Sequence, residues 1–110
     1  MLLRHVIDPD VSSRFGQTVL HFAAARDGIE KESDRTRFAA MLLDWGASIH
    51  RRDDLLKSTP LGWACRWGRE ELAELLIAHG APANEPDAEP WATPLAWAIE
   101  RRLRDHGAKA

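Results

Sequence analysis

The stretch at residues 58–84 has the pattern of two short helices joined by a tight turn. Thr59 is suited to cap the first helix, because its hydroxyl can accept a hydrogen bond from a free backbone amide. Pro60 at the first helical position loses no needed donor. A glycine follows each helix, Gly68 and Gly80, where a left-handed residue can end it. Each helix is shorter than the roughly 12 residues that an isolated helix needs in water, so both must pack on something.

The second of these helices has one apolar face. Glu70 and Glu71 open it, where carboxylates suit the positive end of the helix dipole. Its leucines then fall on a single stripe, at Leu72, Leu75 and Leu76. This stripe predicts the side that packs against the rest of the chain.

The same pattern recurs along the chain at a nearly fixed spacing. The motif that begins at Thr59 returns at Thr18 and Thr93, and Thr59 and Thr93 are 34 residues apart. A second motif, Leu-Ile-Ala-His-Gly-Ala at residues 76–81, is echoed at residues 42–47 and more weakly at residues 2–7 and 103–108. A period near 33 residues, built from a turn and two helices, indicates a stack of helical repeats.

These residues resemble the ankyrin repeat family. Residues 16–24 match the family's G-x-T-P-L-H-x-A-A with one departure, Val19 in the place of proline. Residues 59–84 match a whole repeat core without gaps, with Gly62 in the place of histidine and Pro82 in the place of aspartate. The resemblance covers nearly all of the chain and implies an all-α, ankyrin-type helical solenoid of helix-turn-helix repeats. In this family the repeats are joined by hairpin-like fingers, here expected at residues 7–15, 48–58 and 85–92.

The repeats define one domain of two full repeats flanked by two half repeats. The expected units are residues 1–15, 16–50, 51–84 and 85–110. In the first unit, residues 1–5 resemble the end of a second helix, although Val6 stands where its glycine is expected.

Two departures from the period concern the first and last repeats. The first full repeat has seven extra residues in a polar loop at residues 26–37, before a helix at 35–45 that Ser33 or Asp34 could cap. This loop is either a tolerated insertion or a contact loop. The last unit is seven residues short between Gly80 and Gly107, so one continuous helix is expected from residue 94 to about 106.

Composition narrows the classes of function. The 110 residues carry 15 basic and 17 acidic side chains, a net charge of −2, which gives no general attraction to nucleic acid or to an anionic membrane. The single cysteine, Cys65, excludes an intramolecular disulfide and fits a reducing compartment. No segment has the apolar length of a signal peptide or a membrane span. We expect a soluble, cytoplasmic protein.

The sequence contains no recognisable catalytic, cofactor-binding or metal-binding motif. Its histidines do not converge, because His5, His79 and His106 occupy one phase of successive repeats. By the resemblance, His21 ties neighbouring turns together by hydrogen bonds. Cys65 is expected at a small buried site, as an inert thiol. His50 lies close in sequence to two carboxylates, but without a second ligand pair this finger is expected to be a solvated tip.

Residues for binding a partner follow from the resemblance, which implies contacts through the fingers and the concave ends of the first helices. Arg66 and Trp67 end one such helix, and a tryptophan beside an arginine is typical of an interface hot spot. The alternative is that Trp67 folds over the edge of the core. The other candidates lie at matching helix ends or on the fingers: Arg26, Arg101, Arg52, Asp53, Asp54 and Trp91.

The sequence therefore predicts a non-catalytic module that binds another protein, of unknown identity, through its concave groove and finger tips. The alternative is a targeting, inhibitory or packing segment that acts on a neighbouring domain of a larger protein. A small enzyme is disfavoured, because no convergent polar site can be drawn. Solenoids need about three repeats and polar caps, so we expect low stability alone or end-to-end association of copies.

Overall fold

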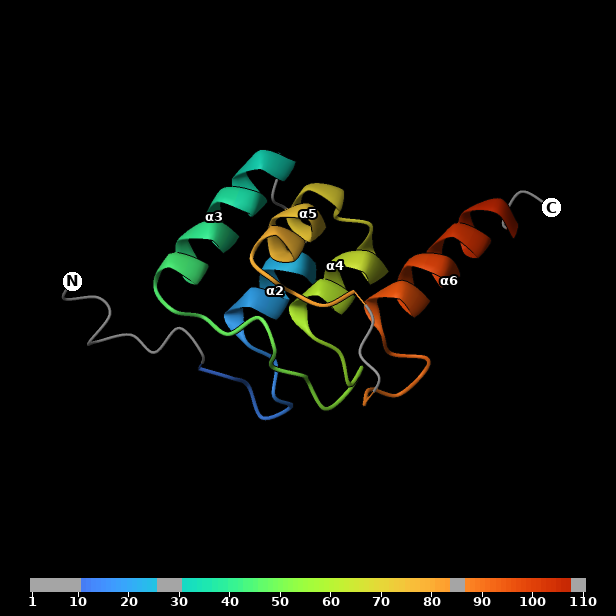
Figure 1. Cartoon of the computed structure of the whole chain (residues 1–110), viewed down its shortest axis with the longest axis horizontal. Coiled ribbons are helices and arrows are strands. Elements are labelled where there is room, and N and C mark those ends of the chain that lie inside the picture. The colour runs from blue at the N-terminus through green and yellow to red at the C-terminus, as the bar shows by residue number, and fades with distance from the viewer. Residues whose placement is uncertain (1–10, 26–30, 84–86, 108–110) are drawn as a thin grey trace.

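The computed structural model describes residues 11–25, 31–83 and 87–107 of the chain. Within these ranges the regular structure is helical, and the β pairing is an isolated bridge between Ser12 and Thr18. The all-α solenoid prediction is confirmed. The helices are α2 (Val19–Ala25), α3 (Glu32–Asp44), α4 (Pro60–Trp67), α5 (Glu70–Ala78) and α6 (Pro94–Gly107) (Figure 1).

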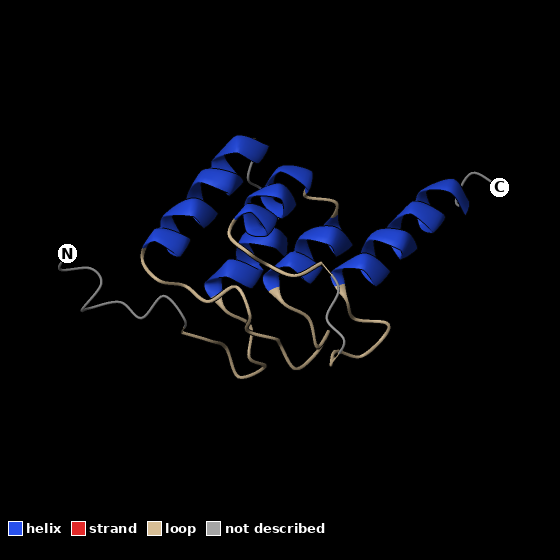
Figure 2. Ribbon diagram, viewed as in Figure 1, coloured by secondary structure: helices blue, strands red, loops and turns tan. Residues whose placement is uncertain are grey.

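The helices form two layers. In one layer α4 packs between α2 and α6, and in the other α3 packs against α5 (Figure 1). The layers are joined within each repeat, since α2 packs on α3 and α4 packs on α5. The connecting fingers gather on one side of the helices, at the lower edge of Figure 2. The first helices of successive repeats are therefore presented side by side, next to the fingers.

The caps of the central repeat lie where the sequence predicts them. The Thr59 hydroxyl accepts a hydrogen bond from the backbone N–H of Gly62 at 3.4 Å, and Pro60 is the first helical residue of α4. Gly68 ends α4 with φ of 71°. Gly80, after α5, has φ of 94°. Both angles lie in the left-handed region that glycine adopts without strain.

The start of α3 differs from the prediction. The helix begins at Glu32, three residues before the expected start, and its N-cap is Lys31 rather than Ser33 or Asp34. Lys31 makes no side-chain cap hydrogen bond. The physical reason lies in Arg35, which is buried and donates to the carbonyl oxygens of Ala23 and Ala24 at the end of α2. This tertiary contact holds the first turn of α3 where no local cap does.

The core is built from the repeated leucines. The side chains of Leu20, Leu42, Leu61, Leu72 and Leu76 are buried together with small residues from α2 to α5. Leu75, the third leucine of the predicted stripe on α5, lies half-buried at the edge of this cluster. The last helix, α6, runs without a break from Pro94 to Gly107, as expected from the shortened spacing.

Candidate partner-binding surface

Asp53 holds the second finger together from inside. Its side chain is 2% exposed, and one carboxylate oxygen, Oδ2, accepts from the N–H groups of Leu55 and Leu56 at 3.0 and 2.7 Å. The other, Oδ1, accepts from the N–H of Ser58 at 3.0 Å and from Nε1 of Trp63 at 2.9 Å. The prediction of a solvated tip is therefore wrong for Asp53, which does not present its charge to a partner. The reason is that the finger folds its turn around this carboxylate, while Asp54 remains exposed.

His21 ties two repeats together, as the sequence predicts. The N–H of Thr18 donates to its Nδ1 at 3.0 Å, so Nδ1 is an acceptor and Nε2 carries the proton. Nε2 then donates to the carbonyl oxygen of Ser58 at 2.9 Å. Burial lowers the pKa of His21 below its ordinary value of 6.5, although the Ser58 carbonyl and the Asp53 charge act in the opposite direction. The imidazole is thus held neutral between two repeats.

We expect acidification to destabilise the protein through His21. The unfolded histidine binds a proton near its ordinary pKa, whereas the folded one binds it only at lower pH. The stabilising effect of neutral His21 is therefore complete above about pH 6.5 and is lost as the pH falls through the folded pKa. Urea denaturation at several pH values should show the free energy of unfolding falling on acidification, and less steeply in His21→Gln. An equal slope in both proteins would contradict this role.

Aromatic side chains from successive repeats form a row on the first helices. The rings of Phe22 and Trp63 meet edge to face with centroids 6.3 Å apart, and Trp63 is followed by Trp67 at 5.2 Å. The row continues on the third repeat, where Trp91 meets Trp97 edge to face at 6.1 Å. Such edge and offset contacts are the favourable arrangements of aromatic pairs.

Arg66 joins the two halves of this row. Its guanidinium carbon lies 5.2 Å from the ring centre of Trp67 and 4.9 Å from that of Trp97. Both distances fall within the range of cation–π attraction. We call the resulting surface the aromatic row: Phe22, Trp63, Trp67, Arg66, Trp97 and Trp91.

The members of the aromatic row differ in their exposure. Trp63 and Trp97 are buried, and their indole N–H groups donate to Asp53 and to the Ser58 hydroxyl. Trp67 and Arg66 are half-buried, whereas Trp91 at one end is 49% exposed. Trp67 therefore packs on the core edge through Trp63 and still reaches the surface, so each of the two interpretations of this residue describes part of its environment.

The remaining predicted site residues lie on different parts of the surface. Arg52 of the second finger pairs with Asp87 of the third at 3.0 Å, and this contact lowers the pKa of the Asp87 carboxyl. Arg101 donates to the Arg66 carbonyl oxygen at 3.1 Å, which caps the end of α4. Arg26 lies outside the described residues.

Several residues of this network carry no signal of their role in the sequence. The Ser58 hydroxyl donates to the Ala92 carbonyl oxygen at 2.7 Å, and so links two fingers. A Cβ at Gly62 would approach Ser58 to 2.9 Å and Trp97 to 3.4 Å, which explains the glycine at this departure from the repeat pattern. Phe22 is an exposed end of the aromatic row, although its repeat phase indicated shared packing between repeats. The repeat phase of Trp63 and Trp97 was the one signal that pointed toward this arrangement.

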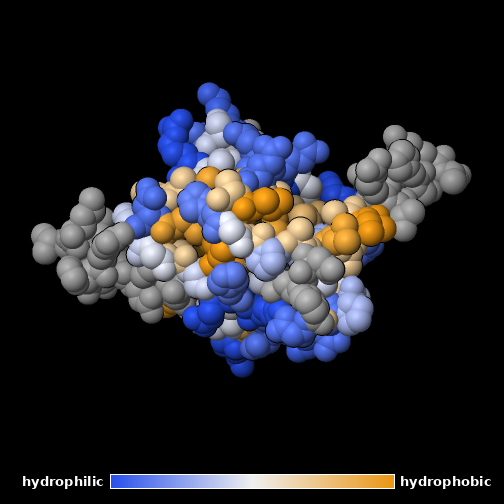
Figure 3. All heavy atoms as spheres, viewed as in Figure 1, coloured by the Kyte–Doolittle hydropathy of each residue, from blue (hydrophilic) through white to orange (hydrophobic). Residues whose placement is uncertain are grey.

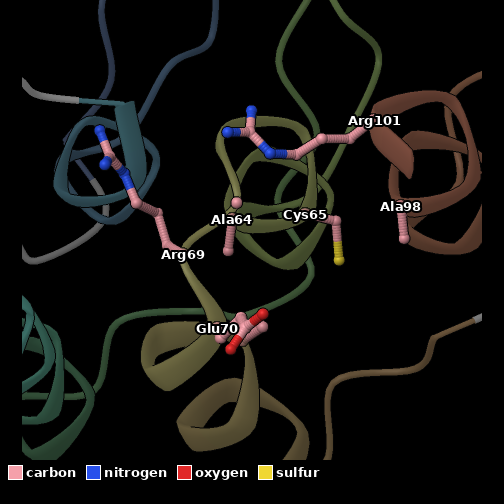
Figure 4. Close-up of a pocket in the computed structure, with 8 residues that line it drawn as sticks. Ala64, Cys65, Arg69, Glu70, Ala98 and Arg101 are labelled. Carbon is pink, nitrogen blue, oxygen red and sulfur yellow. The ribbon is translucent and has the colours of Figure 1, made fainter. Parts of the chain in front are cut away.

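A small open corner of about 440 Å³ lies where α4, α5 and α6 meet. Figure 4 shows Arg101 reaching from α6 across α4, while Arg69 turns toward α2, where it donates to the Ala24 carbonyl oxygen. Cys65 borders this corner and is half-buried, more exposed than predicted, because no helix comes after α6 to cover it in the described part of the chain. Burial still raises the pKa of its thiol. No histidine lines the corner.

Metal ligation and membrane insertion find no support in residues 11–25, 31–83 and 87–107. Within these ranges, no three histidine, cysteine, aspartate or glutamate side chains are grouped so that they could hold a metal ion. The helices of the same ranges are all too short or too polar to cross a membrane.

The repeated caps, leucines and fingers agree with a comparison to known families. A family model described as ankyrin repeats, in three copies, matches residues 1–87, most of the chain. The match ends in the third finger, so α6 lies beyond it, although Thr93 and Pro94 repeat the arrangement that begins α4. The chain belongs to the ankyrin repeat family.

Proposed function

We propose that this protein is a non-catalytic binding module that holds a partner protein through the aromatic row and the neighbouring fingers. Ankyrin repeats are generally protein–protein interaction modules, and the family is typically non-catalytic. The single observation that supports this choice of surface is Arg66, held between the rings of Trp67 and Trp97 and still partly exposed.

The composition and rigidity of the row favour binding. Tryptophan and arginine are enriched among the residues that contribute most to interface affinity. Arg66 is already fixed by two rings, so it loses less side-chain freedom when a partner docks than a free arginine would. Trp91 adds an exposed aromatic ring at the end of the row, next to the third finger.

The fingers are suited to a secondary role in recognition. Asp54 is exposed, and Arg52 and Asp87 form an exposed ion pair between two fingers. Charges at the rim of an interface change mainly the association rate and its dependence on salt. Asp53 has no part in this contact, because it is buried.

The test is a comparison of proteins captured by immobilised variants, identified by mass spectrometry. Arg66→Ala and Trp91→Ala should lose a protein that the wild type captures. Arg37→Ala, which removes an exposed arginine on α3 away from the row, should keep it. Trp67→Ala is a poorer probe, because its ring also packs on Trp63 and its loss would lower stability. Equal capture by all the variants would contradict the proposed surface.

The alternative, a segment that acts on a neighbouring domain of a larger protein, stays a prediction. It would use the same row against a surface of the same chain. Capture of a separate protein that depends on Arg66 would argue for the first proposal.

A further inference from the structure

The third repeat leaves two core positions uncovered. Leu20 and Leu61, which occupy the same repeat position as Leu95, are 0% exposed, whereas Leu95 is 51% exposed. The same contrast holds four residues later, where Ala24 is 0% exposed and Ile99 is 51% exposed. The difference arises from the covering helix of each repeat, since α3 packs on α2 and α5 packs on α4, whereas α6 continues to Gly107 as a single helix.

The uncovered residues form one surface at this end of the stack. Ile77 on α5 is also about half exposed, and the small side chains of Ala73 and Ala98 line the corner between α5 and α6. Figure 3 shows hydrophobic surface on α6 next to that of the central helices. We call this surface the open end: Ile77, Leu95, Ile99, Ala73 and Ala98. Its shape continues the intramolecular stack, and it lacks the second helix of a repeat.

The chain carries a segment with the sequence of a second-helix end. Leu2 occupies the motif position of Leu42 and Leu76, which are buried in the core of the two complete repeats. Residues 1–10 lie outside the described residues, and the ankyrin family model matches the sequence from residue 1. The sequence thus holds a second-helix end before α2 and a first helix, α6, without its own second helix.

We propose that residues 1–7 of a second copy pack on the open end, so that α6 of one copy and the segment of the next together complete one repeat. The occupant is a second copy because of repeat order. The segment precedes α2, and α2 and α6 pack on opposite sides of α4. In its own copy, the segment is next in the stack to α3, where Phe38 and Met41 remain partly exposed.

This contact joins different surfaces of two copies. Such head-to-tail contacts form open chains unless the rotation closes a ring. A few residues against one helix pair give a contact at the small end of specific interfaces, so assembly should depend on concentration. The contact uses neither the aromatic row nor the fingers, and a partner could bind there at the same time.

Sedimentation velocity over a range of concentrations tests this contact in the full chain. Wild type should form species larger than a dimer as its concentration rises, whereas Leu95→Glu and Leu2→Glu should each remain monomeric. We expect each change to weaken association at least about 10-fold, because a charge would be buried against an apolar surface. Leu55→Glu, on the second finger and equally exposed, is the matched control and should associate as wild type does.

Mixing the two variants distinguishes this contact from a symmetric one. The Leu95→Glu copy keeps its N-terminal segment, and the Leu2→Glu copy keeps its open end, so their mixture should form a dimer and nothing larger. A wild-type monomer at every concentration would overturn the proposal, and so would association that survives Leu95→Glu. A mixture that stays monomeric would do the same, while circular dichroism establishes that each variant is folded.

Discussion

Asp53→Ala is expected to lower the free energy of unfolding by about 3 kcal/mol or more. The carboxylate accepts four hydrogen bonds, two of them from Ser58 N–H and Trp63 Nε1, which are buried. Each bond to a charged group contributes about 1.5–3 kcal/mol, and a buried donor left without a partner adds its desolvation cost. Urea denaturation gives the free energy directly.

The neighbouring residue provides the control for Asp53. Asp54 is exposed, so Asp54→Ala should change stability by no more than about 0.5 kcal/mol. Because Asp53 also bonds Nε1 of Trp63, Asp53→Ala should change the near-ultraviolet spectrum of the folded protein as well. Equal stability of the two variants would show that the finger does not depend on the buried carboxylate.

Leu76→Ala is the second change with a large expected effect, about 2–5 kcal/mol. Leu76 is fully buried in the leucine cluster that joins the two layers. Its removal leaves a cavity that the surrounding side chains fill only in part. Ile77→Ala is the matched control, since the adjacent side chain lies at the open end and is half exposed, so its loss should cost much less. A near-neutral Leu76→Ala would contradict the observed core.

Much of the helical architecture could be predicted because its signals are local. Thr59, Gly68 and Gly80 determine the ends of α4 and α5 through bonds and backbone angles that involve residues a few positions away. The continuous α6 followed from a spacing between two glycines. The start of α3 could not be predicted in this way, because it depends on Arg35 reaching the carbonyl groups of another helix.

The candidate site was less predictable, because its contacts cross repeats. A run of charged residues in a finger has the composition of a solvated tip, and nothing local shows that Trp63 and Ser58 direct their N–H groups at Asp53. Arg66 and Trp67 could be selected from the repeat phase. The position of Arg66 over Trp97, 31 residues later, depends on how two repeats stack.

Binding and stability measured on the same Arg66→Ala protein test the proposed binding surface most directly. Titration calorimetry with a partner captured by the wild type gives the affinity, and urea denaturation gives the free energy of unfolding. We expect the affinity to fall at least about 30-fold, corresponding to about 2 kcal/mol, while the free energy of unfolding falls by about 1 kcal/mol or less. Unchanged affinity of the folded variant would contradict the assignment of the aromatic row as the binding surface.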